Sequence, residues 1–220
     1  ALWLKQKYQI PYLVTEHSSR FVEKAVSPLK LKIAQKVFSH SNANIAVSKD
    51  FRDFLQKQFK TEFFYIPNLV NTDFFTPSLS KKESKEYVFL NVGFLVKDKR
   101  QDILIQAFGQ VFGEQENVRL LIAGDGPDYP DLLNLIKKLN LESKVQVLQN
   151  QSRAQIRDLM QQADSFVLSS PYETFGVVLI EALSCGLPVV SVRYGGPSTI
   201  VQNEKIGLLC DFQVESLAQS

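Results

Sequence analysis

The sequence is poor in the residues that build disulfide scaffolds and metal clusters. Its 220 residues include two cysteines, Cys185 and Cys210, and two histidines. Two cysteines are too few for a disulfide framework or a cysteine-based metal site, and they fit a reducing compartment such as the cytoplasm. Histidine is equally sparse, so we expect no zinc site.

Charge and apolar runs exclude two further classes of protein. The formal net charge is +2, which gives no general electrostatic case for binding nucleic acid. No apolar run reaches about 18 residues, so we expect no transmembrane segment. Hydrophobic residues make up 45% of the chain and 16 residues are Phe, which fits a globular protein with a well-buried core.

Three common enzyme motifs are also absent. No Gly-x-Gly-x-x-Gly opens a helix, which argues against a nicotinamide or flavin dinucleotide fold. No Gly-x-x-x-x-Gly-Lys-Ser/Thr is present, which excludes a P-loop nucleotide hydrolase. No Gly-x-Ser-x-Gly marks the nucleophile turn of an α/β hydrolase.

Short apolar segments alternate with helical segments through the second part of the chain. The alternation predicts strands at 87–92, 118–123, 145–148, 165–170, 189–192 and 207–210. Between them it predicts helices at 101–112, 131–140, 153–162 and from near Phe175 to Gly186. Alternating strands and helices of this length indicate an α/β fold with a parallel, doubly wound sheet.

The first part of the chain predicts a smaller α/β unit. We expect a helix end at 1–9, a short buried strand at 11–15, a helix at 20–40, a strand at 45–48, a helix at 50–59 capped by Ser48, and a strand at 63–66. The helix at 20–40 interleaves lysines with apolar residues. Such a face is most often solvated, although peripheral association with the inner face of a membrane is the alternative.

A linker separates the two parts. Residues 71–86 show no periodicity and contain Pro77 and the charge run at 81–86. We therefore divide the chain into an N-terminal unit at 1–75, a linker at 76–86 and a C-terminal unit at 87–220.

The segment 169–188 carries the clearest chemistry. A strand end turns at Pro171 into an apolar helix, whose first free N–H groups and dipole favour an anion such as phosphate. Gly176 lets the anion approach the backbone closely. Glu181 lies among apolar neighbours, roughly 8–9 Å beyond the helix start, where a sugar hydroxyl could bind it. The plainer alternative is that Glu181 lies on a solvated stripe and Glu173 is an ordinary loop acid.

The other predicted loops add cations to the same crevice. The carboxyl ends of the strands carry Lys97, Lys99, Asp125, Glu173 and a glycine pair, Gly195 and Gly196. Lysines beside a helix start, with a carboxylate for hydroxyls, suit a sugar nucleotide. His17 follows the strand at 11–15 and, taken alone, is more often structural.

The segment from Glu173 to Val190 closely resembles the motif of retaining GT-B glycosyltransferases of the group 1, or GT4-type, family. Further matches lie at the family's spacing: Val47-Ser48, Ile66-Pro67-Asn68, Asp73-Phe74-Phe75, Val92-Gly93 with Lys99, Ile122 to Pro127, Ala163-Asp164, and Gly195-Gly196. The resemblance implies two Rossmann-like doubly wound domains, of which only the C-terminal one is nearly complete here. We expect the chain to be a fragment that lacks the start of the N-terminal, acceptor-side domain.

The resemblance also implies roles for individual residues. Glu173, His17 and Lys99 would be catalytic, with Glu173 and His17 at the transferred sugar and Lys99 at the diphosphate. The donor would be bound by Glu181 at the ribose and by Thr174, Phe175, Gly176, Val177, Gly93 and Arg100 around the sugar and phosphates. The implied reaction moves a hexose from a UDP- or GDP-sugar to an acceptor hydroxyl with retention, without metal or cofactor. The acceptor would be a glycan or a lipid-linked molecule in bacterial polysaccharide or glycolipid synthesis.

One departure from the family pattern leaves an alternative open. Phe94 stands where the family usually has an arginine that binds phosphate, and we expect Arg100 to replace it. A weakened phosphate site would also fit a non-catalytic subunit that binds sugar nucleotides. A third alternative is a GT-B relative that catalyses phosphorolysis or epimerisation.

Overall fold

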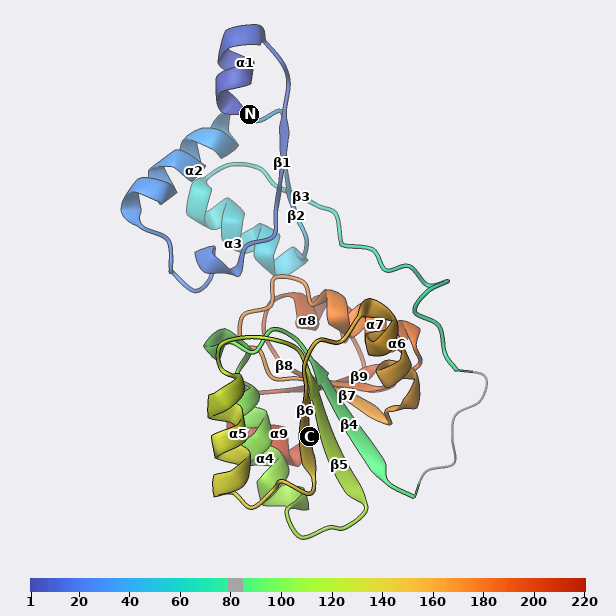
Figure 1. Cartoon of the computed structure of the whole chain (residues 1–220). Coiled ribbons are helices and arrows are strands. Elements are labelled where there is room, and N and C mark those ends of the chain that lie inside the picture. The colour runs from blue at the N-terminus through green and yellow to red at the C-terminus, as the bar shows by residue number, and fades with distance from the viewer. Residues whose placement is uncertain (79–84) are drawn as a thin grey trace.

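The computed structural model describes residues 1–78 and 85–220, which form two α/β units, one above the other in Figure 1. The predicted linker at 76–86, with its charge run, lies mostly outside the described residues. Each unit contains its own parallel sheet. The strands of one sheet precede residue 71 in the sequence, and those of the other follow residue 86.

The N-terminal unit contains a three-stranded parallel sheet in the order β1-β2-β3. Its elements are α1 (Leu2–Tyr8), β1 (Leu13–Glu16), the 3₁₀ helix η1 (Ser19–Phe21), α2 (Pro28–His40), β2 (Ala43–Ala46), α3 (Lys49–Phe59) and β3 (Phe64–Tyr65). Phe38, Phe51, Phe59 and Phe63 are 2–3% exposed and form much of its core. Ser48 caps α3 as predicted, since its side chain accepts a hydrogen bond from the Phe51 N–H at 3.3 Å.

The C-terminal unit is built on a six-stranded parallel sheet in the order β6-β5-β4-β7-β8-β9. The strands are β4 (Tyr87–Val92), β5 (Val118–Ala123), β6 (Val145–Leu148), β7 (Ser165–Leu168), β8 (Val189–Val192) and β9 (Gly207–Cys210). The chain winds outward from β4 to β6 and then returns to the other side of β4 at β7. Ligands of doubly wound sheets bind at this reversal, beyond the carboxyl ends of the two central strands.

Helices cover both faces of the sheet. They are η2 (Lys97–Lys99), α4 (Gln101–Phe112), α5 (Tyr129–Lys138), α6 (Arg153–Gln162), α7 (Val177–Ser184), α8 (Gly196–Ile200) and α9 (Val214–Gln219). One apolar core joins α4, α5 and α9 to the sheet, through residues such as Ile105, Ile136 and Leu217. A second core on the opposite face joins α6 and α7 through Met160 and Leu179. This layered arrangement is the predicted doubly wound fold.

Two predictions for the N-terminal unit were wrong. The helix expected at 20–40 begins only at Pro28, after the short η1 and a left-handed residue, Lys24, with φ of 55°. Proline lacks an N–H and its ring clashes with the preceding turn, so it occupies the first turn of α2 instead of its interior. The first strand is not buried, because Leu13 is 64% exposed on β1 at one end of the sheet.

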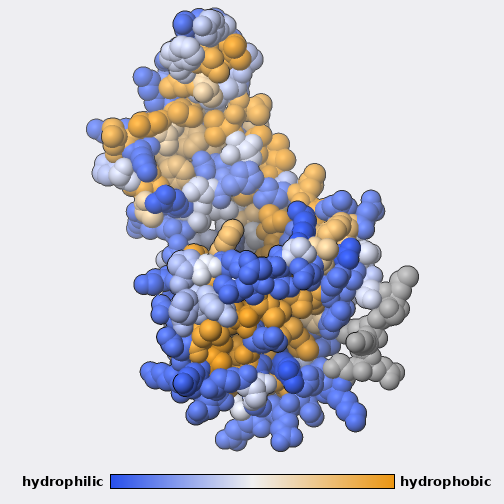
Figure 2. Space-filling view, in the orientation of Figure 1, coloured by the Kyte–Doolittle hydropathy of each residue, from blue (hydrophilic) through white to orange (hydrophobic). Residues whose placement is uncertain are grey.

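Apolar residues gather over the N-terminal unit in the space-filling view, and the surface is hollowed where the two units meet (Figure 2). Leu13, Leu29 and Trp3 are among the exposed large apolar residues of this unit. Among the described residues, no helix is long and apolar enough to cross a bilayer. The candidate site is lined by residues of both units.

Candidate functional site

A cavity of about 450 Å³ opens at the reversal of the sheet, between the carboxyl ends of β4 and β7. Nine of the ten residues predicted for the site line it: His17 from the N-terminal unit, and Gly93, Lys99, Glu173, Thr174, Phe175, Gly176, Val177 and Glu181 from the C-terminal unit. The fold therefore collects residues that are up to 164 positions apart in sequence (Glu181 less His17) around one space.

Backbone geometry fixes the loop that forms the floor of this cavity. Gly176 has φ of 89°, a left-handed conformation that strains other residues, and it precedes the first residue of α7. Gly196 lies so close to this loop that a Cβ there would be 2.2 Å from the Phe175 Cα. The Gly196 N–H also donates to the Glu173 carbonyl at 2.9 Å. The glycine pair thus holds Glu173 and the start of α7 in place.

Lys99 and Glu173 form an ion pair inside the cavity. Their side chains are 29% and 14% exposed, so water only partly screens the pair. Two buried serines at the end of β7 hold the lysine segment, since the Ser169 hydroxyl donates to the Lys99 carbonyl at 2.8 Å and the Ser170 hydroxyl to that of Asp98. A cation is therefore held beside the carboxylate, facing the helix start.

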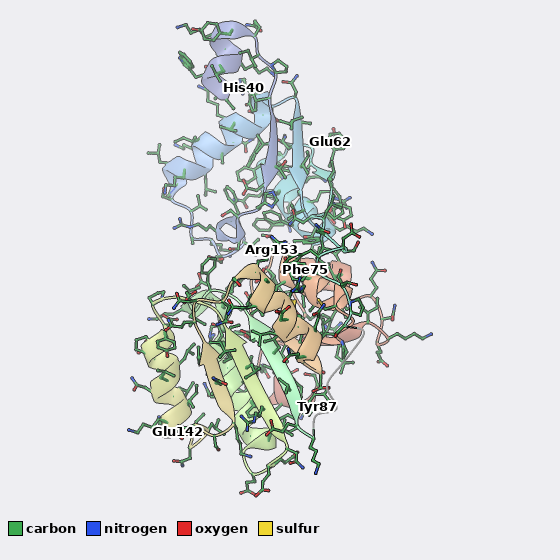
Figure 3. The ribbon with its side chains drawn as sticks, turned by 45° about the vertical axis from the view of Figure 1, so that its right-hand side comes forward. His40, Glu62, Phe75, Tyr87, Glu142 and Arg153 are labelled. Atoms are coloured by element: carbon green, nitrogen blue, oxygen red, sulfur yellow. The ribbon has the colours of Figure 1, made fainter. Side chains whose placement is uncertain are left out.

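Glu181 lies on α7 and is paired with an arginine that the sequence did not single out. Arg153 Nη2 lies 3.2 Å from Glu181 Oε1, and its guanidinium also lies 5.2 Å from the Phe75 ring centroid. Figure 3 shows Arg153 and Phe75 together at the junction of the units. Burial raises the pKa of Glu181, and the charge of Arg153 offsets part of that rise. Arg153 was missed because its sequence neighbours give no sign that it folds back onto α7.

His17 reaches the cavity across the junction of the two units. It directly follows β1, and its backbone carbonyl accepts a hydrogen bond from the Thr174 hydroxyl at 2.9 Å. This bond joins the N-terminal unit to the loop that carries Glu173. The histidine and the glutamate thus line the same cavity, one from each unit.

Arg100 is the predicted residue that the structure does not bring to the cavity. Its guanidinium forms two hydrogen bonds with Asp102, at 2.9 and 3.0 Å, and lies over the Phe212 ring. The expected replacement of the missing arginine is therefore not present in this geometry. Phe94 does line the cavity and is 73% exposed there.

Asn91 is a second residue that sequence reasoning missed. It lines the cavity, is 2% exposed and follows the point where the ladder between β4 and β7 ends at Leu90 and Phe166. Its Nδ2 donates to the Val167 carbonyl at 2.8 Å and so bridges the two parting strands. Its Oδ1 has no partner among the described residues. A lone asparagine in an apolar strand could have signalled this position.

The described residues contain no group of three or more His, Cys, Asp or Glu side chains placed to hold a metal ion. The charged groups of the cavity are instead Lys99, Glu173 and Glu181, arranged around the N-terminus of α7. Such an arrangement can bind phosphate at the helix start and hydroxyl groups at the carboxylates.

Comparison with solved structures gives the same fold over nearly the whole chain. Sucrose-phosphate synthase from Thermosynechococcus elongatus superimposes with a TM-score of 0.90 at 24% identity, over 99% of this chain and 59% of that one. Anabaena HepE, solved with UDP and glucose, superimposes with a TM-score of 0.87 at 24% identity, over 99% of this chain and 63% of that one. These neighbours confirm the GT-B architecture with Rossmann-like units.

Curated relatives are similar in sequence, although they are longer. N-acetyl-α-D-glucosaminyl L-malate synthase of Bacillus anthracis is 34% identical over 57% of this chain and 32% of its own length. The GPI3 subunit of the phosphatidylinositol N-acetylglucosaminyltransferase of Saccharomyces cerevisiae is 32% identical over 70% of this chain and 36% of its own. The chain thus spans about a third of the length of these relatives. The sequence profile of the family called glycosyl transferases group 1 matches residues 75–220, and the chain belongs to that family.

Proposed function

We propose that the protein transfers a hexose from a nucleoside-diphosphate sugar to an acceptor hydroxyl, with retention of anomeric configuration and without a metal ion. The observation that carries the proposal is the single cavity in which Lys99, Glu173 and Glu181 surround the N-terminus of α7. The cavity has the volume of a small-molecule site and lies at the reversal of the sheet, where such folds bind nucleotides.

In the proposed complex, the charged groups bind different parts of the donor. The distal phosphate lies on the free N–H groups at Gly176 and Val177, and Lys99 adds a positive charge there. Together they offset the charge that develops on the leaving diphosphate, which is the role that a metal ion has in other transferases. Glu181 accepts hydrogen bonds from the ribose hydroxyls, and Glu173 and His17 face the transferred sugar.

The names of the relatives narrow the choice of donor. One is named as an N-acetylglucosaminyltransferase and one by an N-acetylglucosaminyl product, and the α-monoglucosyldiacylglycerol synthase of Acholeplasma laidlawii, 28% identical, is named by a glucosyl product. We therefore propose UDP-N-acetylglucosamine and UDP-glucose as the first donors to test, followed by GDP-sugars. The acceptors in these names differ, so we propose only the class, a glycan or lipid-linked hydroxyl in bacterial polysaccharide or glycolipid synthesis. Such work fits the cytoplasm, at the inner face of the membrane.

The proposal is tested by nucleotide release and by binding. The protein is incubated with each UDP- or GDP-sugar and a panel of acceptors, with and without a chelator, and free nucleoside diphosphate is measured. Release that continues in chelator supports the proposal, and complete loss on chelation contradicts metal independence. NMR of the product shows whether the configuration is retained. The absence of release with every donor contradicts the transferase.

A second candidate, a non-catalytic subunit that binds sugar nucleotides, is favoured by one observation. The cavity contains exposed Phe94 where the family usually has an arginine, and Arg100 is held away by Asp102. Calorimetry distinguishes the two functions, because the subunit binds UDP or GDP without turnover. Phe94→Arg distinguishes the two functions further. It tightens nucleotide binding in both cases, but it starts turnover only if weak phosphate binding limits catalysis.

A further inference from the structure

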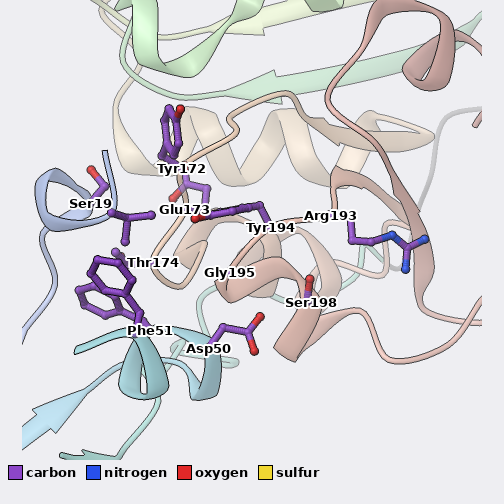
Figure 4. A pocket seen from close by; sticks show the side chains of 12 residues that line it. Ser19, Asp50, Phe51, Tyr172, Glu173, Thr174, Arg193, Tyr194, Gly195 and Ser198 are labelled. Carbon is purple, nitrogen blue, oxygen red and sulfur yellow. The ribbon is translucent and has the colours of Figure 1, made fainter. Parts of the chain in front are cut away.

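A second pocket, of about 270 Å³, lies between the two units on another side of the loop that carries Glu173. Its walls come from η1 and α3 of the N-terminal unit, and from the loop after β7, the loop after β8 and α8 of the C-terminal unit (Figure 4). They include Asp50, Phe54, Tyr172, Glu173, Tyr194 and Ser198. Of these six, only Glu173 also lines the larger cavity.

Aromatic rings form a large part of this pocket. The rings of Tyr172 and Tyr194 meet edge to face, with centroids 6.0 Å apart and an angle of 86° between their planes. They remain 39% and 45% exposed, so their mutual contact leaves ring surface open to a ligand. Phe54 lies opposite on α3, where it stacks on Phe51. Ring faces carry negative charge density and attract the weakly positive C–H groups of a ligand.

Polar groups without partners surround these rings. The hydroxyls of Tyr172, Tyr194 and Ser198 and the carboxylate of Asp50 form no hydrogen bond with any residue that the structure describes. Burial raises the pKa of Tyr194, and the charges of Tyr172 and Asp50, which line the same pocket, raise it further. A ligand with several hydroxyl groups can bind all of them at once.

The charges of the pocket disfavour an anion. Asp50 is unpaired, and Glu173 is paired with Lys99 outside this pocket. Arg193, the only cation in the lining, points away in Figure 4 and donates to the Leu209 carbonyl at 3.0 Å. A phosphate or a carboxylate would therefore meet negative charge without compensation.

We propose that this inter-unit pocket binds one neutral sugar ring, with its C–H face on the tyrosine pair and its hydroxyls on Asp50 and Ser198. A pyranose combines an apolar face with a polar rim, which matches the arrangement of the walls. The site adjoins the nucleotide cavity, with which it shares Glu173 and Thr174, but its tyrosine pair and Asp50 line only the second pocket. A sugar bound there contacts both units, and it therefore stabilises their present arrangement.

Saturation-transfer NMR on the whole chain tests the proposal, with the methyl α-glycosides of glucose, galactose, mannose and N-acetylglucosamine as probes. UDP is present at saturation, so that the nucleotide part of the larger cavity is filled, and Tyr194→Ala distinguishes the second pocket from the sugar part of that cavity, which Tyr194 does not line. We expect saturation transfer to at least one glycoside, persisting in UDP. Tyr194→Ala and Asp50→Asn each weaken its binding by about tenfold or more. Asp53→Asn and Tyr8→Ala are matched controls, since both side chains are exposed and lie outside the pocket.

Four results would overturn the proposal. They are no transfer to any glycoside, displacement of the glycoside by UDP, unchanged binding in Tyr194→Ala, or tighter binding of glucose 1-phosphate than of the neutral glycoside. Thermal melting of each variant shows whether it folds. Glu181→Gln leaves glycoside binding unchanged, so a failure of nucleotide binding is distinguishable from a failure of the second pocket.

Discussion

The surroundings of Glu181 disfavour the ionised form of its carboxyl group. Its side chain is 15% exposed, and burial raises its pKa more than Arg153 lowers it. A carboxyl with a raised pKa destabilises the fold once it ionises, so this cost is absent at acid pH and present as the pH rises through the folded pKa. Ribose binding is the use that we propose for this carboxylate.

The first prediction therefore separates stability from binding at this residue. Glu181→Gln removes the buried charge, and we expect its melting temperature at neutral pH to exceed that of the wild type by a few degrees at most. The difference shrinks as the pH falls below the folded pKa of Glu181. UDP binding weakens by about 10–100-fold, because hydrogen bonds to a charged acceptor are lost. Melting curves across pH and titration calorimetry measure both effects.

The second prediction concerns the arginine that holds this carboxylate. Arg153→Met removes the charge that lowers the pKa of Glu181, so that pKa rises further. We expect UDP affinity to decline at a higher pH on acidification than in the wild type, with little change at neutral pH. The shift is small and is reduced by salt, because Arg153 is 66% exposed.

Arg157→Met is the matched control for this change. Arg157 lies one turn along α6 and contacts the Phe74 ring, but it pairs with Asp158 instead of Glu181. If both variants give the same pH profile as the wild type, Arg153 does not position Glu181.

The sequence predicted the charged residues that lie within a motif. It did not predict the positions of charged side chains that depend on packing in the folded chain. Glu173 and Glu181 were predicted to share a site because seven residues and a strand-to-helix turn fix their spacing. Arg153 was not predicted to lie in this site, because α6 and α7 come together only in the folded chain. Arg100 was misplaced for a local reason, as Asp102 two positions later binds its guanidinium.

At the scale of elements, two glycines near the site differ in what surrounds them. A Cβ on Gly196 would lie 2.2 Å from the Phe175 Cα, whereas one on Gly93 would meet nothing closer than 3.9 Å. The first glycine is required by the loop that carries Glu173. The second, at the end of β4, has room for a methyl group and lines the cavity.

The third prediction uses this contrast. Gly196→Ala pushes the loop at Phe175 away, and we expect a loss of stability of about 1–3 kcal/mol, typical of overpacking, with loss of nucleotide binding. Gly93→Ala retains its melting temperature but weakens UDP binding, because the methyl group occupies donor space. Thermal melts measure the stability of the two variants, and calorimetry measures their UDP binding. Equal melting temperatures for both would contradict the close approach of Gly196.

Some element boundaries were predicted correctly. Strand β4 and helices α4 and α6 match their predicted ranges because strong apolar periodicity and Ser152, which caps α6, define them. The helix at 20–40 was predicted too long, because its apolar pattern continues through Ser27 and the weight of Pro28 was overlooked. Helix α9 was not predicted, since six residues give too short a pattern for the helical period to show.

At the scale of the whole molecule, Phe175 is one of the side chains that join the two units. Phe175 belongs to the loop of the C-terminal unit, but it is 4% exposed within the core of the N-terminal unit, beside residues such as Phe51. Gly176, whose backbone the proposed phosphate approaches, is the next residue. The sequence predicted two units and their order, but it could not predict this contact, because the two cores become neighbours only in the folded chain.

The last prediction compares two buried phenylalanines of the same cluster. Phe175→Ala and Phe63→Ala each remove a ring from this core, at about 3–5 kcal/mol, and each lowers the melting temperature. Phe63 is 2% exposed inside the N-terminal unit and does not touch the cavity. We therefore expect UDP affinity, measured by calorimetry well below the melting range, to decline in Phe175→Ala and to persist in Phe63→Ala. Equal affinities would show that the nucleotide site forms without support from the N-terminal unit. A selective decline would mean that the packing of one unit sets the geometry of the donor site in the other.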